Sequence, residues 1–126
     1  MYPGKMKHEM EMEEDADGIH FGAFTDNKLA GVVSLFQSGT SFQFRKLAVD
    51  AAIQKAGIGS SLLAYITKYA EESGGTRIWC NARIDAIGFY LKLGFVETED
   101  RFSKNGIDYV IMEKMLTPPL NLQESR

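Results

Sequence analysis

Apolar and polar residues alternate with a period of two along SFQFRKLAV, which begins at Ser41 and predicts a β-strand. Phe42 and Phe44 share one face of that strand, whereas the next apolar pair, Leu47 and Val49, is one residue out of phase with them. A β-bulge at Arg45–Lys46 would produce this change of phase. Because a bulge leaves main-chain N–H and C=O groups unpaired, the end of the strand is a candidate binding surface for a ligand.

An apolar stripe with helical spacing follows over residues 58–72, IGSSLLAYITKYAEE, and predicts an amphipathic helix with its stripe in the core. Gly57 and Gly59 stand where this helix begins. Glycines allow the backbone to approach a ligand closely, and the first helical N–H groups have no partner within the helix. A phosphate or pyrophosphate would suit that end, although two glycines with this spacing are also common in ordinary turns.

The remaining apolar runs predict further strands around this unit. HFGAF and LAGVVSLFQ are separated by a hairpin turn at residues 25–28, and a second turn at 38–40 leads into the central strand. TRIWCNA follows the helix and its glycine cap at residues 73–75, so we expect it to lie parallel to the central strand. A second helix with Asp85 as N-cap ends at Gly94, and two strands, 95–102 and 109–115, close the domain.

The N-terminal residues carry little apolar character. Six of the nine residues from Glu9 to Asp17 are acidic, so we expect a loosely ordered polar leader over residues 1–17, a domain over 18–116 and a tail over 117–126. A sheet that starts only at residue 18 would expose its edge near residues 19–24, which proteins commonly cover. A second copy of the chain, as in a homodimer, would cover it.

Composition narrows the class of protein. The 126 residues suffice for one core without disulfides, and Cys80 is the only cysteine. His8 and His20 stand alone in the sequence, so no metal site is expected. With a net charge of −3, the chain has no basic stripe for nucleic acid. No segment has the length of a membrane span or the apolar core of a signal peptide, so we expect a cytoplasmic protein.

Two motifs carry a resemblance to a known family. Residues 54–59 read QKAGIG and residues 86–95 read AIGFYLKLGF. They resemble the Q/R-x-x-G-x-G/A loop and the A-x-x-F-Y-x-K-x-G-F signature of the GCN5-related N-acetyltransferase (GNAT) family, and the likeness extends over residues 18–116. It implies an α/β fold: a mixed, mostly antiparallel sheet with a central splayed pair of parallel strands and flanking helices, here with the N-terminal elements short or missing.

The resemblance also implies acetyl-CoA as cofactor and a role for each matched residue. The pantetheine arm would pair with the strand end, the pyrophosphate would lie on the amides of the loop and helix start, and residues of the second helix would flank the thiol arm and the nucleotide. These cofactor-binding residues are Leu47, Ala48, Val49, Gln54, Lys55, Ala56, Gly57, Ile58, Gly59, Ser60, Phe89 and Lys92. Tyr90 matches a tyrosine that protonates the departing thiolate in many members of the family.

The function expected is direct acetyl transfer from acetyl-CoA to the amine of a small molecule. Tyr90 could instead be a core aromatic residue, and Cys80 could carry a covalent acetyl group, although a thiol within an apolar strand is more often inert. The sequence leaves the general base open: Asn81, Asp85, Glu13 and Glu14 are candidates, and the substrate could also bind as the free amine. The alternatives are a non-catalytic acyl-CoA-binding or regulatory module and a phosphate site for another nucleotide.

Overall fold

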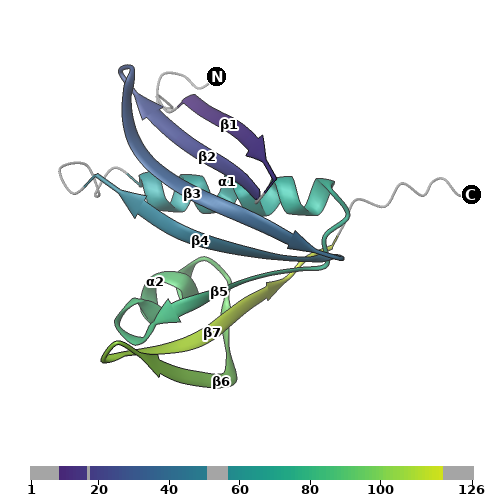
Figure 1. Ribbon diagram of the computed structural model, residues 1–126, viewed down its shortest axis with the longest axis vertical. Helices are drawn as coiled ribbons and strands as arrows, with labels where there is room; N and C mark the ends of the chain where they lie inside the picture. The colour runs from purple at the N-terminus through teal and green to yellow at the C-terminus, as the bar shows by residue number, and fades with distance from the viewer. Residues whose placement is uncertain (1–8, 17, 51–56, 118–126) are drawn as a thin grey trace, which may run out of the picture. The chain divides into compact units, whose positions relative to one another are not determined.

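The computed structural model describes residues 9–16, 18–50 and 57–117. Strands and helices follow one another in the order expected from the sequence, with one additional strand at the start (Figure 1). The elements are β1 (Glu9–Asp15), β2 (Gly18–Thr25), β3 (Lys28–Ser38), β4 (Ser41–Val49), α1 (Ile58–Glu72), β5 (Arg77–Arg83), the 3-10 turn η2 (Ile84–Ala86), α2 (Ile87–Lys92), β6 (Val96–Lys104) and β7 (Ile107–Met115).

The strands form one seven-stranded sheet in the order β1-β2-β3-β4-β5-β7-β6. β4 and β5 pair in parallel, Ser41 with Arg77 and Gln43 with Trp79, and α1 connects them. The pairs β1–β2, β2–β3, β5–β7 and β6–β7 are antiparallel. The mixed, mostly antiparallel sheet with a central parallel pair is therefore confirmed.

The N-terminal segment corrects one expectation. Residues Glu9–Asp15 form β1 and pair along their whole length with β2, from Glu9 opposite Phe24 to Asp15 opposite Gly18. A loosely ordered leader was therefore the wrong prediction for these residues, because pairing with a neighbouring strand outweighs the poor strand propensity of glutamate. Since β1 covers β2, the exposed edge that favoured a homodimer does not exist there, and the homodimer stays a prediction without that support.

Contacts divide the chain into two compact units that share parts of β3, β4 and α1. The first contains residues up to Phe36 and residues 44–67, and in it α1 packs on one face of the strands. The ring of Phe21 on β2 meets that of Tyr65 on α1 at 5.7 Å between centroids. The core of this unit consists of Ile19, Phe21, Ala23, Ala30, Val33, Leu35, Phe44, Ile58, Leu62, Leu63 and Ile66.

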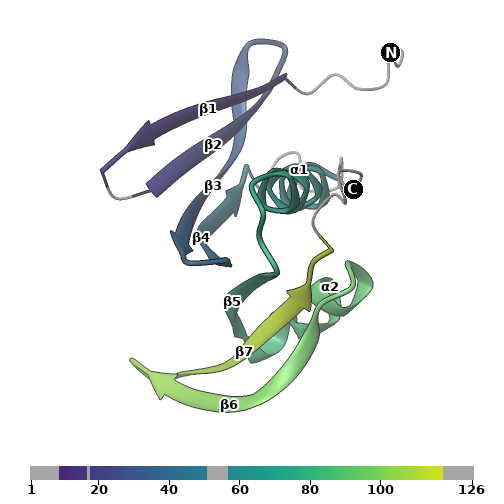
Figure 2. The ribbon, with the colours of Figure 1, turned by 90° about the vertical axis from the view of Figure 1, so that its right-hand side faces the viewer.

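The second unit contains residues 37–43 and the chain from Lys68 onward. β6 and β7 form its hairpin (Figure 2), in which Asn105 and Gly106 have positive φ as a tight hairpin turn requires. The helix α1 ends as predicted: Gly74 has a φ of +86° and the Gly75 amide donates to the Ala70 carbonyl. The core of this unit consists of Phe42, Ala70, Ile78, Cys80, Ala82, Phe95, Val110, Met112 and Leu116.

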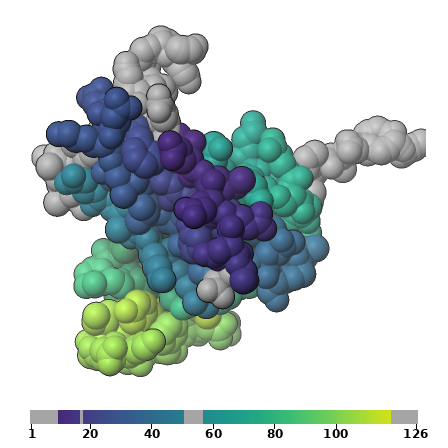
Figure 3. All heavy atoms as spheres, turned by 45° about the horizontal axis from the view of Figure 1, so that its top comes forward, coloured from purple at the N-terminus to yellow at the C-terminus, as the bar shows by residue number. Residues whose placement is uncertain are grey.

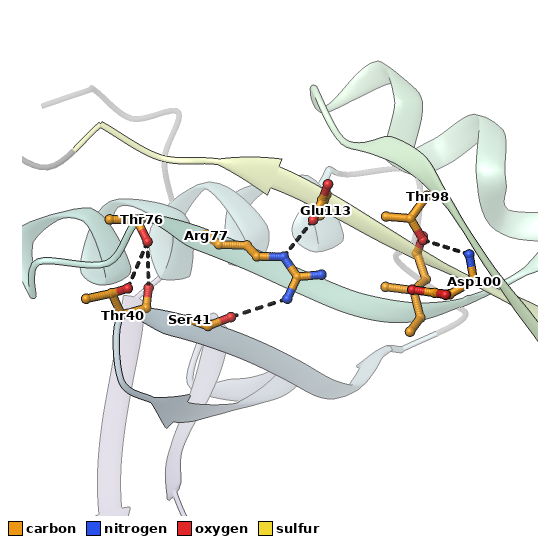
Figure 4. Close-up of polar contacts among 8 residues, drawn as sticks. Thr40, Ser41, Thr76, Arg77, Thr98, Asp100 and Glu113 are labelled. Atoms are coloured by element: carbon orange, nitrogen blue, oxygen red, sulfur yellow. Dashed lines mark hydrogen bonds and ion pairs between the residues drawn. The ribbon is translucent and has the colours of Figure 1, made fainter.

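Side chains fix the first residues of the parallel pair (Figure 4). The Thr76 hydroxyl donates to the Thr40 hydroxyl at 2.9 Å, and the Thr76 amide donates to the Thr40 carbonyl. Arg77 donates through Nε to Glu113 at 2.6 Å and through Nη1 to Ser41 at 3.4 Å. These bonds hold the start of β4 and the start of β5 in one register and tie both to β7.

The second helix differs from its prediction at the N-terminus. Asp85 is not an N-cap, because residues Ile84–Ala86 form a 3-10 turn and Asp85 accepts a bond from Arg83 instead. Gly94 ends the helix as expected, with a φ of +94° and with the Phe95 amide donating to the Tyr90 carbonyl. In the described ranges, no helix is long and apolar enough to cross a membrane.

Candidate functional site

The end of β4 has the irregularity that the sequence predicted. Lys46 has a φ of +61°, a left-handed conformation that is uncommon for a residue other than glycine, and Arg45 and Lys46 are both exposed. The regular alternation of Phe42 and Phe44 is thus broken. The predicted change of phase at Arg45–Lys46 is confirmed, and beyond it Leu47 and Val49 are half-buried while Ala48 is exposed.

Gly31 on β3 lies close to both the end of β4 and the start of α1. A Cβ at Gly31 would lie 2.9 Å from Ile58 Cγ2 on α1 and 3.1 Å from the Ala48 carbonyl oxygen on β4. The Asp50 amide donates to the Ala30 carbonyl at 2.8 Å, so β3 also bonds to the residue that follows the end of β4. The first turn of α1 can therefore lie close to the strand because residue 31 has no side chain.

The first turn of α1 carries main-chain donors that the hydrogen bonds of the helix itself leave over. Gly57 has a φ of +81°, and the first helical hydrogen bond runs from the Ser61 amide to the Gly57 carbonyl at 2.9 Å. The amides of Ile58, Gly59 and Ser60 precede that bond and have no helical partner. The first turn of α1 holds no acidic side chain of its own that would interact with the positive end of the helix dipole. The predicted Gln54, Lys55 and Ala56 lie outside the described residues.

Tyr90 lies on α2, in the second unit, within an aromatic cluster. Its ring meets those of Phe89 and Phe95 edge to face, at 5.1 and 5.9 Å between centroids. Burial, with a smaller contribution from the neighbouring Cys80, raises the pKa of the Tyr90 phenol well above its usual value. The phenol therefore keeps its proton at neutral pH. Phe89 and Lys92 on the same helix are exposed.

Cys80 is buried on β5, and burial raises the pKa of its thiol from 9.0 to about 12. The thiolate is the nucleophilic form of cysteine, so a thiol with this pKa is almost wholly unreactive at neutral pH. The geometry argues against a covalent acetyl-cysteine step and leaves direct transfer as the simpler route.

The candidates for the general base differ in their surroundings. Asp85 bonds to Arg83 at 3.5 Å, and Asn81 is exposed at the end of β5. Glu13 pairs in register with His20 on β2, whereas Glu14 pairs with Ile19, whose side chain is buried. Successive side chains of a strand point to opposite faces, so Glu13 and Glu14 lie on different faces of the sheet. The structure selects none of these residues as the base.

His20 is a polar residue that sequence reasoning treated as unremarkable. Its Nδ1 lies 2.8 Å from the Ser34 hydroxyl and its Nε2 lies 3.1 Å from the Asp15 carboxylate, so three strands contribute to one chain of hydrogen bonds. Ser34 is buried. These residues are distant in sequence, and only the register of β1, β2 and β3 brings them together; no local motif signals the arrangement.

A mixed seven-stranded sheet, in which a strand end and a helix start meet at Gly31, is the fold that the resemblance to acyl-CoA-dependent transferases implies. The Acetyltransferase (GNAT) domain family matches residues 1–116. An uncharacterized N-acetyltransferase of Bacillus subtilis, YitI, is 31% identical over 113 residues, which span 82% of this chain and 76% of the relative. The chain belongs to the GNAT acetyltransferase family.

Solved structures of the same fold include proteins with the cofactor bound. A GNAT family acetyltransferase from Elizabethkingia anophelis with acetyl-CoA bound superposes with a TM-score of 0.75 at 16% identity, covering 89% of this chain and 100% of that one. An aminoglycoside 6'-N-acetyltransferase complexed with coenzyme A has a TM-score of 0.70 at 20% identity, covering 83% and 76%. At these identities the likeness establishes the fold alone.

Proposed function

We propose that the protein transfers an acetyl group from acetyl-CoA to the amine of a small molecule by direct attack. The observation that carries the proposal is the close approach at Gly31, which brings the end of β4 and the first turn of α1 together in a chain of the GNAT family. Fold neighbours that hold coenzyme A or acetyl-CoA support the choice of cofactor. A cytoplasmic location remains part of the proposal.

Acetyl-CoA supplies the acetyl group as a thioester. In this proposal the main chain of Leu47, Ala48 and Val49 pairs with the pantetheine arm, and the amides of residues 57–60, together with the loop residues 54–56, donate to the pyrophosphate. Because Lys46 disturbs the pairing of β4, an N–H group near Leu47 can donate to the developing oxyanion. Phe89 and Lys92 are assigned to the thiol arm and the nucleotide, respectively.

Tyr90 donates a proton to the departing thiolate in this mechanism. An alkyl thiol has a pKa of roughly 8 to 9 in water, below that of a phenol. A thiolate released into a buried site is destabilised by the same loss of water that raises the pKa of Tyr90, so its affinity for a proton rises as well. The protonated phenol is therefore the form required at the moment of transfer.

The test is calorimetric titration of the full chain with acetyl-CoA, followed by a thiol-release assay with a panel of primary amines. Binding with amine-dependent release is the expected result. Binding without release by any amine would favour the non-catalytic acyl-CoA-binding module instead. Absence of binding would reject the cofactor, and stabilisation by ATP or NAD in a thermal shift assay would point to another nucleotide.

A further inference from the structure

The proposed acetyl transfer gives no role to one chain of hydrogen bonds, which joins Asp15, His20 and Ser34. The Ser34 hydroxyl lies 2.8 Å from His20 Nδ1, and the Asp15 carboxylate lies 3.1 Å from His20 Nε2. A hydroxyl beside an imidazole whose other nitrogen meets a carboxylate is the arrangement that activates a serine as a nucleophile. The chain therefore has the composition and the connections of a catalytic triad.

The hydrogen bonds assign the tautomer of His20. An ionised carboxylate only accepts hydrogen bonds, so the bond to Asp15 places the imidazole proton on Nε2. Nδ1 of the neutral ring then accepts a hydrogen bond from the Ser34 hydroxyl. The roles of the two nitrogens are exchanged relative to the serine-protease triad, and either nitrogen can act as a base. In this tautomer His20 can take a proton from Ser34.

Neighbouring contacts orient the carboxylate and the imidazole. The Gly18 amide donates to Asp15 Oδ1 at 3.2 Å, while Oδ2 faces His20. The ring of Phe36 meets the imidazole edge to face, at 6.5 Å between centroids. Gly18 leaves room for that ring, because a Cβ at Gly18 would lie 2.8 Å from Phe36 Cδ2. Both groups are thus held by a second contact, as the parts of a catalytic site must be.

A groove of about 450 Å³ on the face of β1, β2 and β3 turned away from α1 gives access to these side chains. Phe21 contacts Tyr65 of α1, so the alternate residue His20 lies on the opposite face. His20 and Ser34 both line the groove, and Figure 3 shows β1, in purple, on the molecular surface. The groove lies wholly within the first unit. A substrate and water can therefore reach the imidazole and the hydroxyl.

The lining of the groove limits the kind of substrate. Phe24, Leu29 and Val32 contribute apolar side chains, which suit a hydrocarbon group. Glu11 and Glu13 line the groove from β1, and carboxylates repel an anionic substrate. The groove therefore fits an uncharged ester with an apolar acyl chain and disfavours a phosphorylated thioester such as acetyl-CoA.

We propose that Ser34, His20 and Asp15 form a second catalytic site, which hydrolyses uncharged carboxylic esters with an apolar acyl chain. Ser34 Oγ attacks the carbonyl carbon while His20 Nδ1 takes the hydroxyl proton, and the tetrahedral intermediate expels an alkoxide, which receives that proton. Water, deprotonated by the same nitrogen, then attacks the carbonyl carbon of the acyl-serine; the carboxylic acid leaves and Ser34 recovers its proton. Asp15 is a positioning residue that keeps the imidazole proton on Nε2.

The expected activity is slow. Activation of the hydroxyl by His20 is a general-base effect, which contributes about 10²–10⁴-fold in rate. Among the described residues no lysine or arginine lines the groove, so water solvates the developing oxyanion and we expect the lower end of that range. The reaction needs no coenzyme A, so it can be measured independently of the proposed acetyl transfer.

The test uses the full chain without acetyl-CoA and has two readouts. The first is a fluorophosphonate probe, which loses fluoride as an activated serine bonds to phosphorus, with the labelled peptide located by mass spectrometry. The second is the hydrolysis of p-nitrophenyl butyrate, followed by absorbance. We expect the label on Ser34, and Ser34→Ala and His20→Gln should each lower the hydrolysis rate by about 10²-fold. Circular dichroism verifies that both variants fold.

Ser103→Ala is the matched control, because the Ser103 hydroxyl bonds to a carboxylate, that of Asp108, rather than to an imidazole. Labelling and hydrolysis should be unchanged in this variant. A folded parent protein without label on Ser34 would overturn the proposal, as would equal hydrolysis by Ser34→Ala and the parent. Acetyl-CoA binding, titrated in the same preparations, reports separately on the proposed function.

Asp15→Asn tests the positioning role. The asparagine oxygen would keep the bond from the Gly18 amide, so its NH₂ group would face Nε2 and favour a proton on Nδ1. Nitrogen-15 NMR of the imidazole, with His20→Gln to identify its signals, should show the proton on Nε2 in the parent and on Nδ1 in Asp15→Asn. Labelling of Ser34 should fall by about 10²-fold in the variant. Unchanged labelling, or a parent ring protonated on Nδ1, would remove Asp15 from the site.

Discussion

Gly31 and Ile58 are in such close contact that a methyl group on Gly31 would lie 2.9 Å from Ile58 Cγ2, with Leu62 Cδ1 at 3.0 Å and the Ala48 carbonyl oxygen at 3.1 Å. The Ala48 oxygen belongs to the backbone, and the side chains of Ile58 and Leu62 are buried. Gly31→Ala must therefore push α1 away from β4. We expect a loss of about 1–3 kcal/mol in the free energy of unfolding and weaker acetyl-CoA binding, measured by urea denaturation and calorimetry.

Gly88→Ala is the matched control, because a Cβ at Gly88 meets no atom within 4 Å. Gly88 lies in α2, where alanine is the better helix former, so this variant should be as stable as the parent or slightly more stable. If both alanine variants behave alike, the contact with Ile58 does not position the helix.

Gly59→Asp should abolish acetyl-CoA binding and leave the fold intact. Gly59 lies in the first turn of α1, where a carboxylate interacts favourably with the helix dipole and supports the helix. The same carboxylate would occupy and repel the site assigned to the pyrophosphate. Calorimetry should show no heat of binding, while the melting temperature stays within a few degrees of the parent. Unaltered affinity would remove the helix start from the cofactor site, and Gly59→Ala serves as a control for bulk without charge.

Tyr90→Phe should lower turnover by about 10²-fold or more with little change in the affinity for coenzyme A, because only the proton donor is removed. Tyr65→Phe is the comparison: Tyr65 is 42% exposed on α1 and its ring packs on Phe21, so loss of its hydroxyl should leave turnover unchanged. A Tyr90→Phe enzyme as active as the parent would mean that Tyr90 is a packing residue.

Alkaline pH should destabilise the protein through Cys80 and Tyr90. Burial raises the pKa of Cys80 from 9.0 to about 12 and that of Tyr90 from 10.0 to a higher value, so above about pH 9 the unfolded chain releases protons that the folded chain retains. The unfolded state then binds fewer protons, and the free energy of unfolding falls as pH rises. Urea denaturation between pH 8 and about pH 11 should show this fall. Above pH 10.0, the usual pKa of tyrosine, the free energy of unfolding should fall less steeply in Tyr90→Phe than in the parent. Equal slopes for the two proteins would contradict the raised pKa of Tyr90.

The Arg77–Glu113 ion pair should contribute measurably to stability because it is partly shielded from water. The two side chains are 31% and 27% exposed and 2.6 Å apart, and Arg77 also donates to Ser41. Glu113→Gln should cost about 1–3 kcal/mol. The Lys68–Glu72 pair, 74% and 61% exposed at 4.0 Å, provides the control, and Glu72→Gln should cost no more than about 0.5 kcal/mol. Equal losses would mean that shielding at Glu113 does not matter.

Local patterns predicted those parts of the fold that local interactions decide. The apolar stripe of residues 58–72 gave the bounds of α1, since one face had to be buried, and the phase slip between Phe44 and Leu47 located the left-handed Lys46. Gly74 and Gly94 marked helix ends because both adopt positive φ there. Each of these features depends on residues within a few positions of one another.

Features that depend on distant residues were missed. The strand β1 forms from EMEMEED, whose glutamates disfavour a strand in isolation, because β2 supplies hydrogen-bond partners for the whole segment. Asp85 has the composition of an N-cap, but the chain enters α2 through a 3-10 turn. The Asp15–His20–Ser34 chain follows from the register of three strands, which no segment specifies alone.

The burial of Cys80 has a practical consequence for experiments that count free sulfhydryl groups. It is the only cysteine of the chain, and in the folded protein it is inaccessible to a colour-forming disulfide reagent. The signal from released coenzyme A therefore has no background from the native enzyme, whatever the enzyme concentration. The sulfhydryl group of Cys80 would react only in molecules that have unfolded. The same reagent therefore also reports the fraction of the preparation that has lost its native state.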